Sequence, residues 1–309
     1  MLVQADTIPR TGSGDGDGET KMRLHTMILP AVLAVAGLAA VAVVAQTAAP
    51  KAPAGANDLG YDDTPMLPGL PYRVHDKTRP HPRVVTPADK PGGAPSDAIV
   101  LFDGRDLSKW RAAKAGANGG IYATADPAPW AVANGILEAT PGKSDIATVE
   151  KFGSIQIHLE WCPPAEPRGN SQNRGNSGIK FQGRYELQVL DSYQNPTYAD
   201  GQAGAIYGEW PPLVNAVHKP GEWNTYDAVF EAPQLDGDKL VKPGYVTVFL
   251  NGVLLHNRKE IMGITAHRQF PKYQPQSAEE SLVLQNHNGG EKFRNIWVRR
   301  IGGYDLPEK

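Results

Sequence analysis

Polar and apolar side chains alternate along the segment from Lys180 to Ser192. Positions 180, 182, 184, 186 and 188 are Lys, Gln, Arg, Glu and Gln, with apolar residues at 181, 185, 187 and 189. Because successive side chains of a strand point to opposite faces, the pattern predicts one strand with an apolar face and a row of long polar groups. Such a row suits a sugar-binding surface, while an ordinary solvated sheet face accounts for this segment about equally well.

Other short runs in the same part of the chain also predict strands. Asn-Gly pairs mark hairpin turns inside Trp130–Glu138 and Tyr245–His256, and strict alternation predicts a strand over Ser154–Trp161. Further strands are expected at residues 98–104, 281–287 and 293–301. Many short strands without helical periods between them favour an all-β sandwich or jelly roll over residues 97–302, followed by a short tail at 303–309.

The N-terminal region has the parts of a secretory signal peptide between residues 21 and 49. A basic stretch at Lys21–His25 precedes an apolar run from Met27 to Ala45, and small residues around Val43–Ala45 offer a cleavage pattern. A membrane anchor is the alternative, because about 18 apolar residues can just span a bilayer. We expect cleavage, export to the periplasm or the extracellular space, and no stable membrane insertion of the mature chain.

Two further segments lack a hydrophobic period. Residues 1–20 are rich in Gly and Asp and are expected to be disordered or to precede the true start at Met22. Prolines recur through residues 50–96, which favours an extended segment. Apolar residues within 63–75 indicate that part of this segment lies against the domain surface.

Composition narrows the possible partners. A formal net charge of −2 over 309 residues leaves no basic footprint, so we expect no nucleic-acid partner. Cys162 is the only cysteine, so an intrachain disulfide cannot form. A lone thiol more often packs as a small hydrophobe than it reacts.

Five stretches of the sequence resemble, in order, the 3-keto-disaccharide hydrolase domain, a family formerly carried as a domain of unknown function. They are Leu101–Trp110, Asn176–Ile179, Arg184–Ser192, Gly221–Asn224 and Asn295–Arg299. The resemblance covers roughly residues 97–302 and implies a concanavalin-like jelly roll of two antiparallel sheets. It also implies a carbohydrate substrate, a 3-keto-glycoside, produced by a partner oxidoreductase that oxidises a sugar at C3.

A keto group at C3 of a sugar acidifies the neighbouring C2–H, so a base can remove that proton. Loss of the C1 oxygen substituent then gives an enone, and water can add to it for a net hydrolysis. Such a site needs a base, a group that stabilises the enolate and an acid for the leaving group. The candidate catalytic residues are Glu186, His158, Glu160 and His287, and Glu186 is the preferred base. Lys180 and Arg184 could supply positive charge.

Residues that are expected to bind the substrate lie along the same strands and in nearby loops. They are Asn176, Lys180, Arg184, Gln188, Asp191, Tyr207, Trp223 and Gln285. Several of them could instead have a purely structural role: Asp191 could only cap a turn, Arg184 could pair with Glu186, and aromatic residues more often belong to a core. The polar loop at residues 173–178 is expected beside the sugar site.

Other functions remain open from the sequence alone. A non-catalytic carbohydrate-binding module would use the same fold and polar face. An ordinary endo-glycosidase would need two facing carboxylates, for which Glu160 and Glu186 are candidates. No cofactor is required by the sequence, although the four candidate catalytic residues could form a divalent metal site if the strands bring them together.

Overall fold

The computed structural model describes residues 59–287 and 289–305. The expected disordered start and the expected signal peptide lie outside the described residues. Within the described part, no helix is long and apolar enough to cross a membrane.

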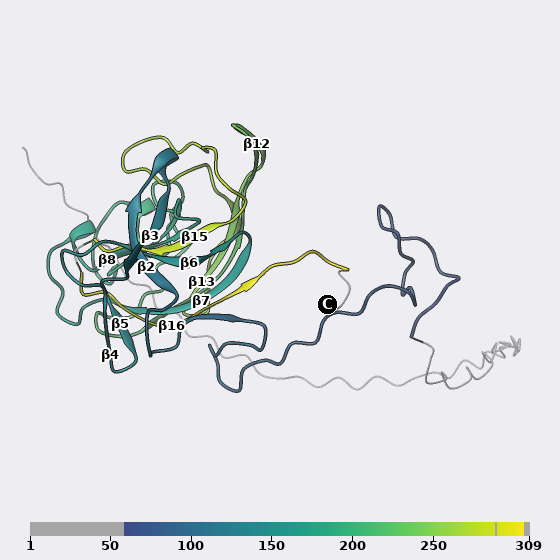
Figure 1. The fold of residues 1–309 in the computed structure, drawn as a ribbon, viewed down its shortest axis with the longest axis horizontal. Helices are drawn as coiled ribbons and strands as arrows, with labels where there is room; N and C mark the ends of the chain where they lie inside the picture. The colour runs from purple at the N-terminus through teal and green to yellow at the C-terminus, as the bar shows by residue number, and fades with distance from the viewer. Residues whose placement is uncertain (1–58, 288, 306–309) are drawn as a thin grey trace, which may run out of the picture. The chain divides into compact units, whose positions relative to one another are not determined.

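Two antiparallel sheets form the domain and confirm the predicted all-β sandwich (Figure 1). In spatial order, the eight-stranded sheet contains β14 (Val253–Glu260), β13 (Tyr245–Leu250), β10 (Asn224–Glu231), β7 (Ile155–Cys162), β16 (Lys292–Arg300), β5 (Ile136–Glu138) and β4 (Ala131–Ala133), with β1 (Ile99–Phe102) also paired to β16. The six-stranded sheet contains β3 (Ile121–Pro127), β2 (Trp110–Ala115), β6 (Ile146–Phe152), β15 (Glu280–Leu284), β8 (Asn176–Phe181) and β9 (Tyr185–Leu190).

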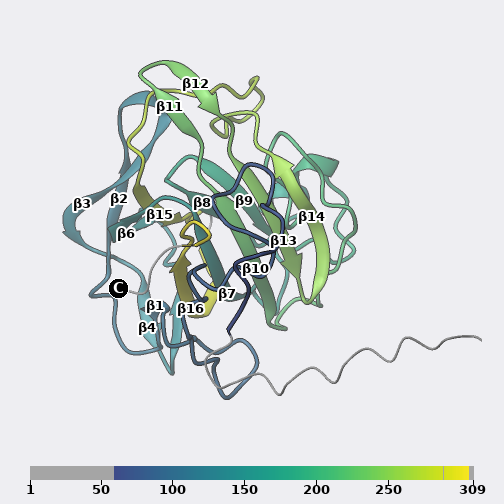
Figure 2. The ribbon, with the colours of Figure 1, turned by 90° about the vertical axis from the view of Figure 1, so that its right-hand side faces the viewer.

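Short elements complete the described fold. A two-stranded ribbon of β11 (Gln234–Asp236) and β12 (Lys239–Lys242) lies at one end of the sandwich (Figure 2). The helical segments are single 3-10 turns at Ala117–Gly119, Ser171–Asn173 and Ala199–Gly201. Both Asn-Gly hairpins predicted from the sequence are present, as β4–β5 and β13–β14.

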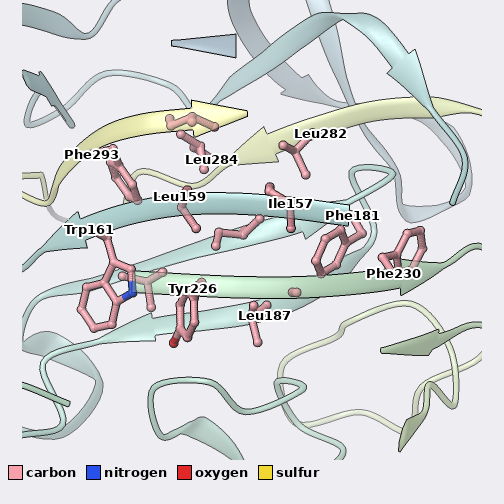
Figure 3. Packing of buried hydrophobic residues seen from close by; sticks show 14 of the residues in the cluster. Ile157, Leu159, Trp161, Phe181, Leu187, Tyr226, Phe230, Leu282, Leu284 and Phe293 are labelled. Carbon is pink, nitrogen blue, oxygen red and sulfur yellow. The ribbon is translucent and has the colours of Figure 1, made fainter. Parts of the chain in front are cut away.

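The core lies between the two sheets and is built from alternate residues of the strands (Figure 3). Ile157, Leu159 and Trp161 of β7 point into it from the eight-stranded sheet. Across the layer, the ring of Phe181 in β8 stacks on Phe230 in β10 with centroids 4.6 Å apart. Each such buried side chain stabilises the fold by roughly 2 kcal/mol. Because alternate residues face the core, the residues between them face outward from each sheet.

The segment from Lys180 to Ser192 is a hairpin, and the prediction of a single strand was wrong. β8 ends at Phe181 and β9 begins at Tyr185, with Gln182 and Gly183 at φ angles of 52° and 63° in the turn. The Gln182 amide holds this turn by donating to the carbonyls of Phe152 (3.2 Å) and Ala278 (2.8 Å). The alternation of polar and apolar residues continues across the turn, so the reversal of the chain leaves no mark in the sequence pattern. Lys180 therefore faces Glu186 across the strand pair.

The proline-rich segment contains no strand of either sheet in its described part. Its end is attached to the outer face of the eight-stranded sheet, where the carbonyl of Gly92 accepts bonds from Asn295 (2.8 Å) and Trp297 (2.9 Å). Asp97 forms a bidentate pair with Arg299 at 2.7 Å. This face of the eight-stranded sheet is therefore covered by the chain itself near Gly92.

Candidate active site

A polar pocket of about 520 Å³ lies on the outer face of the six-stranded sheet. Its floor consists of side chains from β8 and β9 that alternate with core residues. Loops after other strands form the rim. The lining residues are Ser171, Gln172, Asn173, Asn176, Lys180, Glu186, Gln188, Tyr198, Tyr207, Thr265, His267, Gln285 and His287.

Lys180 and Glu186 form a buried ion pair at the centre of this floor. The Lys180 ammonium donates to Oε2 of Glu186, and the side chains are only 10% and 5% exposed. Charges that leave water are tolerated when they are paired and hydrogen-bonded, and the second oxygen of Glu186 is also satisfied. In the orientation that fits its surroundings, the amide of Gln188 donates to Oε1 of Glu186 at 3.1 Å.

Gly178 provides the space in which the Glu186 carboxylate lies. It is opposite Gln188 in the β8–β9 pair and has no positive φ. A Cβ at this position would lie 2.7 Å from Oε1 and 2.9 Å from Cγ of Glu186. Glycine is required here by a close approach rather than by backbone conformation.

The rim is fixed to β9, which is an edge strand of its sheet. The backbone N–H of Glu186 donates to the hydroxyl of Thr265 (2.9 Å), and its carbonyl accepts from the N–H of Tyr207 (3.1 Å). The N–H of Thr265 in turn donates to the carbonyl of Arg184 (3.0 Å). These bonds use the free backbone groups of the edge and hold two loops over the floor.

Asp145 adds a second carboxylate beneath the rim. The backbone N–H of Asn286 donates to its Oδ1 at 2.8 Å, which holds the loop that carries Gln285 and His287. Burial raises the pKa of Asp145, while the charges of Lys180 and His287 act to lower it. Its side chain is therefore within electrostatic range of the floor without lining the pocket.

Seven of the residues predicted to form the site line this pocket. They are Asn176, Lys180, Glu186, Gln188, Tyr207, Gln285 and His287. Sequence reasoning missed Ser171, Gln172, Tyr198, Thr265 and His267, as well as Asp145 beside it. The loop expected beside the site does contribute Asn173, but the other missed residues lie in loops where no periodic pattern marks them.

His158 and Glu160 lie on the other sheet, on the outer face of β7. His158 stacks on Trp297 with centroids 5.2 Å apart, and its Nδ1 is 2.7 Å from Asp227. Glu160 accepts bonds from Arg294 (2.5 Å) and Asn295 (2.9 Å). The whole core separates these residues from Glu186, so of the four candidate catalytic residues only Glu186 and His287 lie in the pocket.

The same geometry excludes Glu160 and Glu186 as an ordinary glycosidase pair. Packed sheets lie about 10 Å apart, and the two carboxylates project from the opposite outer faces. Paired glycosidase carboxylates are separated by about 5–9.5 Å across the scissile bond.

Three predicted substrate-binding residues also lie outside the pocket. Arg184, in the β8–β9 turn, donates to the carbonyl of Asn118 and to the hydroxyl of Tyr122, not to Glu186. Asp191 pairs bidentately with Arg174 at 2.7 and 3.0 Å and caps the turn at Tyr193. The ring of Trp223 lies under the guanidinium of Arg294, 4.0 Å from its centroid.

No group of three His, Cys, Asp or Glu side chains within residues 59–287 and 289–305 is arranged to hold a metal ion. The proposed set of His158, Glu160, Glu186 and His287 is divided between the two sheets.

The all-β sandwich with a polar pocket on the outer face of its six-stranded sheet can be compared with known proteins. A family model described as the 3-keto-alpha-glucoside-1,2-lyase-like domain matches residues 97–299, and the chain belongs to this family.

Solved structures provide a second comparison. A "putative glycosyl hydrolase" from Parabacteroides distasonis ATCC 8503, at 2.13 Å, is 43% identical with a TM-score of 0.66, covering 76% of this chain and 100% of that one. Another "putative glycosyl hydrolase" from the same organism, at 1.70 Å, is 23% identical with a TM-score of 0.46, covering 67% and 94%. No curated protein matches the chain.

Proposed function

We propose that this protein cleaves 3-keto-glycosides and that Glu186 removes the proton from C2 of the keto-sugar. The buried Lys180–Glu186 pair carries the proposal, because Glu186 is the only carboxylate among the described residues that line the pocket. An ordinary glycosidase uses two carboxylates at the scissile bond. A keto-sugar needs only one base at C2, since its own carbonyl provides the activation.

The chemistry assigns a separate task to each member of the pair. Glu186 takes the C2 proton, and the electron pair of the C–H bond forms an enolate whose negative charge lies on O3. The Lys180 ammonium stabilises this charge as it develops. The enolate then expels the C1 oxygen substituent and becomes an enone, and addition of water to the enone completes a net hydrolysis.

The pocket has the size and polarity for one sugar ring. Its volume of about 520 Å³ is within the usual range for small-molecule sites. The amides of Gln172, Asn176, Gln188 and Gln285 offer both donors and acceptors to sugar hydroxyls. His287 adds an imidazole, whose ring nitrogens can donate and accept hydrogen bonds.

The proposed reaction depends on a second enzyme that makes its substrate and on the compartment in which the two meet. The substrate requires a partner oxidoreductase that oxidises the C3 hydroxyl of a glycoside. We also propose that the chain is exported, on the basis of residues 21–49. Sequencing the N-terminus of protein recovered from the periplasm or medium tests export. An uncleaved chain in the membrane fraction would instead indicate a membrane anchor.

The decisive experiment compares matched 3-keto and unoxidised glucosides, with and without a chelator, and identifies the products. We expect turnover of the 3-keto compounds alone. Cleavage of unoxidised glycosides would contradict the proposal in favour of an ordinary glycosidase. Turnover of neither, together with measurable binding, would indicate a carbohydrate-binding module. Loss of turnover with the chelator would indicate that the reaction requires a divalent metal.

A further inference from the structure

The pocket shares a wall with a second hollow of about 380 Å³. Tyr198, Tyr207 and His267 line both spaces and form the wall. Asp200, Arg268 and Gln269 line the second hollow only. A polar hollow of this size, next to a pocket that fits one sugar ring, can hold a second hydroxylated group.

The wall is a chain of three hydrogen-bonding groups centred on Tyr207. Its hydroxyl is 2.5 Å from the hydroxyl of Tyr198 and 2.9 Å from Nδ1 of His267. The rings of Tyr207 and His267 are stacked with centroids 6.4 Å apart. The phenol of Tyr207 therefore lies at the boundary between the two spaces, in contact with a group that can supply a proton.

The wall is fixed relative to Glu186. The N–H of Tyr207 donates to the carbonyl of Glu186, and the loop that carries His267 is tied to the same residue through the Thr265 hydroxyl. Glu209 further joins the two loops, because its carboxylate accepts from the N–H of Met262 at 2.7 Å. The base and the phenol are thus positioned by one strand edge.

We propose that the substrate lies across both spaces, with its leaving group in the second hollow, and that the Tyr207 hydroxyl protonates the departing oxygen. This inference rests on the proposed function, which leaves the acid unassigned. Glu186 takes the proton from C2, the C1–O bond breaks with its electron pair on oxygen, and that oxygen takes the proton of Tyr207. His267 then returns a proton to the phenolate from solvent.

The electrostatic surroundings of Tyr207 suit an acid that must stay protonated until it reacts. Burial raises the pKa of its phenol, and the hydrogen bond with Tyr198 and the charge of Glu186 act in the same direction. The raised pKa keeps the phenol protonated at pH 7 and makes it a weaker acid, so it can protonate only a strongly basic leaving group such as a departing alkoxide.

Substrates with different leaving groups test this role. Alcohols leave only with a proton, whereas 4-nitrophenol is a far stronger acid and leaves as its anion. We expect Tyr207→Phe to slow methyl 3-keto-glucoside and a 3-keto-disaccharide by roughly 10²–10⁴-fold, and 4-nitrophenyl 3-keto-glucoside by less than about tenfold. His267→Gln, at an exposed position, should slow the three substrates in the same order as Tyr207→Phe does, but by smaller factors.

Two results would overturn the assignment. An equal loss for all three substrates in folded Tyr207→Phe and His267→Gln proteins would mean that the wall only positions the substrate. Full activity of both variants would show that Tyr207 and His267 take no part in the reaction. These results differ from a failure of the proposed function, in which the unmodified protein cleaves none of the 3-keto compounds and the inference falls with it.

Discussion

The ammonium of Lys180 donates to the carboxylate of Glu186 across the β8–β9 hairpin, and both side chains are nearly removed from solvent. A hairpin turn of Gln182 and Gly183 places the two residues opposite each other. The same pair places a carboxylate at the floor of the pocket and provides a cation beside it. Stability and the proposed chemistry therefore depend on the same contact.

Glu186→Gln should abolish the proposed proton abstraction while it largely spares binding. The amide keeps the size of the side chain and one of its two accepting oxygens, but it cannot accept the C2 proton. We expect kcat on a 3-keto-glucoside to fall by roughly 10²–10⁴-fold, as for the loss of a general base. Single-turnover kinetics and calorimetric binding measure the two effects separately.

Glu160→Gln is the matched control for this variant. It makes the same chemical change on the outer face of the other sheet, where Glu160 pairs with Arg294. Its kcat should stay within about twofold of the unmodified protein. Unchanged turnover in Glu186→Gln would eliminate Glu186 as the base, and a large loss in Glu160→Gln would show that the other face takes part.

Lys180→Met should destabilise the domain more than the double replacement of the pair. The single variant leaves the Glu186 carboxylate buried without its cation, which typically costs about 3–5 kcal/mol. Adding Glu186→Gln removes the unpaired charge and should recover much of that loss. Urea unfolding of the single and double variants gives the coupling energy, and simple additivity would mean that the pair contributes little to stability.

The strands were predictable because burial leaves a period of two in the sequence. In β13, residues that face the core alternate with more exposed ones. In β7, apolar residues that face the core alternate with polar ones, although the outward-facing His158 is also buried. The order of strands in space was not predictable, because β7 pairs with β10 and β16, which lie far along the chain. Without that order, the separation of His158 from Glu186 by the whole core could not be inferred.

The rest of the site depends on loops that have no periodic signal. Thr265 and Tyr207 reach the pocket because the Thr265 hydroxyl and the Tyr207 N–H bond to the free backbone groups of Glu186 at the edge of β9. His267 follows Thr265 into the wall, and Asp145 is placed by its bond from Asn286. Such positions are determined by tertiary hydrogen bonds rather than by local sequence.

Gly178→Ala should disturb Glu186 without straining the backbone. The added methyl group would lie within 3 Å of three atoms of the Glu186 side chain, which is pinned by Lys180 and Gln188. Overpacking of this kind typically costs about 1–3 kcal/mol, and we expect a large loss of kcat as well. Melting temperature and kcat are the measurements.

Gly303→Ala is a suitable comparison, because its Cβ would meet no atom within 4 Å and its φ is not positive. This variant should retain both stability and activity. If Gly178→Ala behaves like Gly303→Ala, the carboxylate can move freely, and close packing does not fix the position of the base.

Glu291→Gln should reduce the loss of stability that we expect as the pH rises. Glu291 is 1% exposed, and its Oε2 has no partner among the described residues. Burial, together with the charge of Glu138, raises its pKa from 4.5 to about 7. The folded state therefore binds the proton more tightly than the unfolded state does, so the free energy of unfolding falls as the pH rises from 4.5 through 7.

The Glu291→Gln variant cannot ionise at this position. Between pH 5 and pH 8, its free energy of unfolding should fall by on the order of 2 kcal/mol less than that of the unmodified protein. Some dependence should persist, because burial also raises the pKa of Glu209 to about 7. Urea unfolding of both proteins at the two pH values measures the difference. Glu138→Gln, at a half-exposed side chain, should change the slope little. Parallel pH profiles for Glu291→Gln and the unmodified protein would show that the Glu291 carboxyl does not titrate in this range.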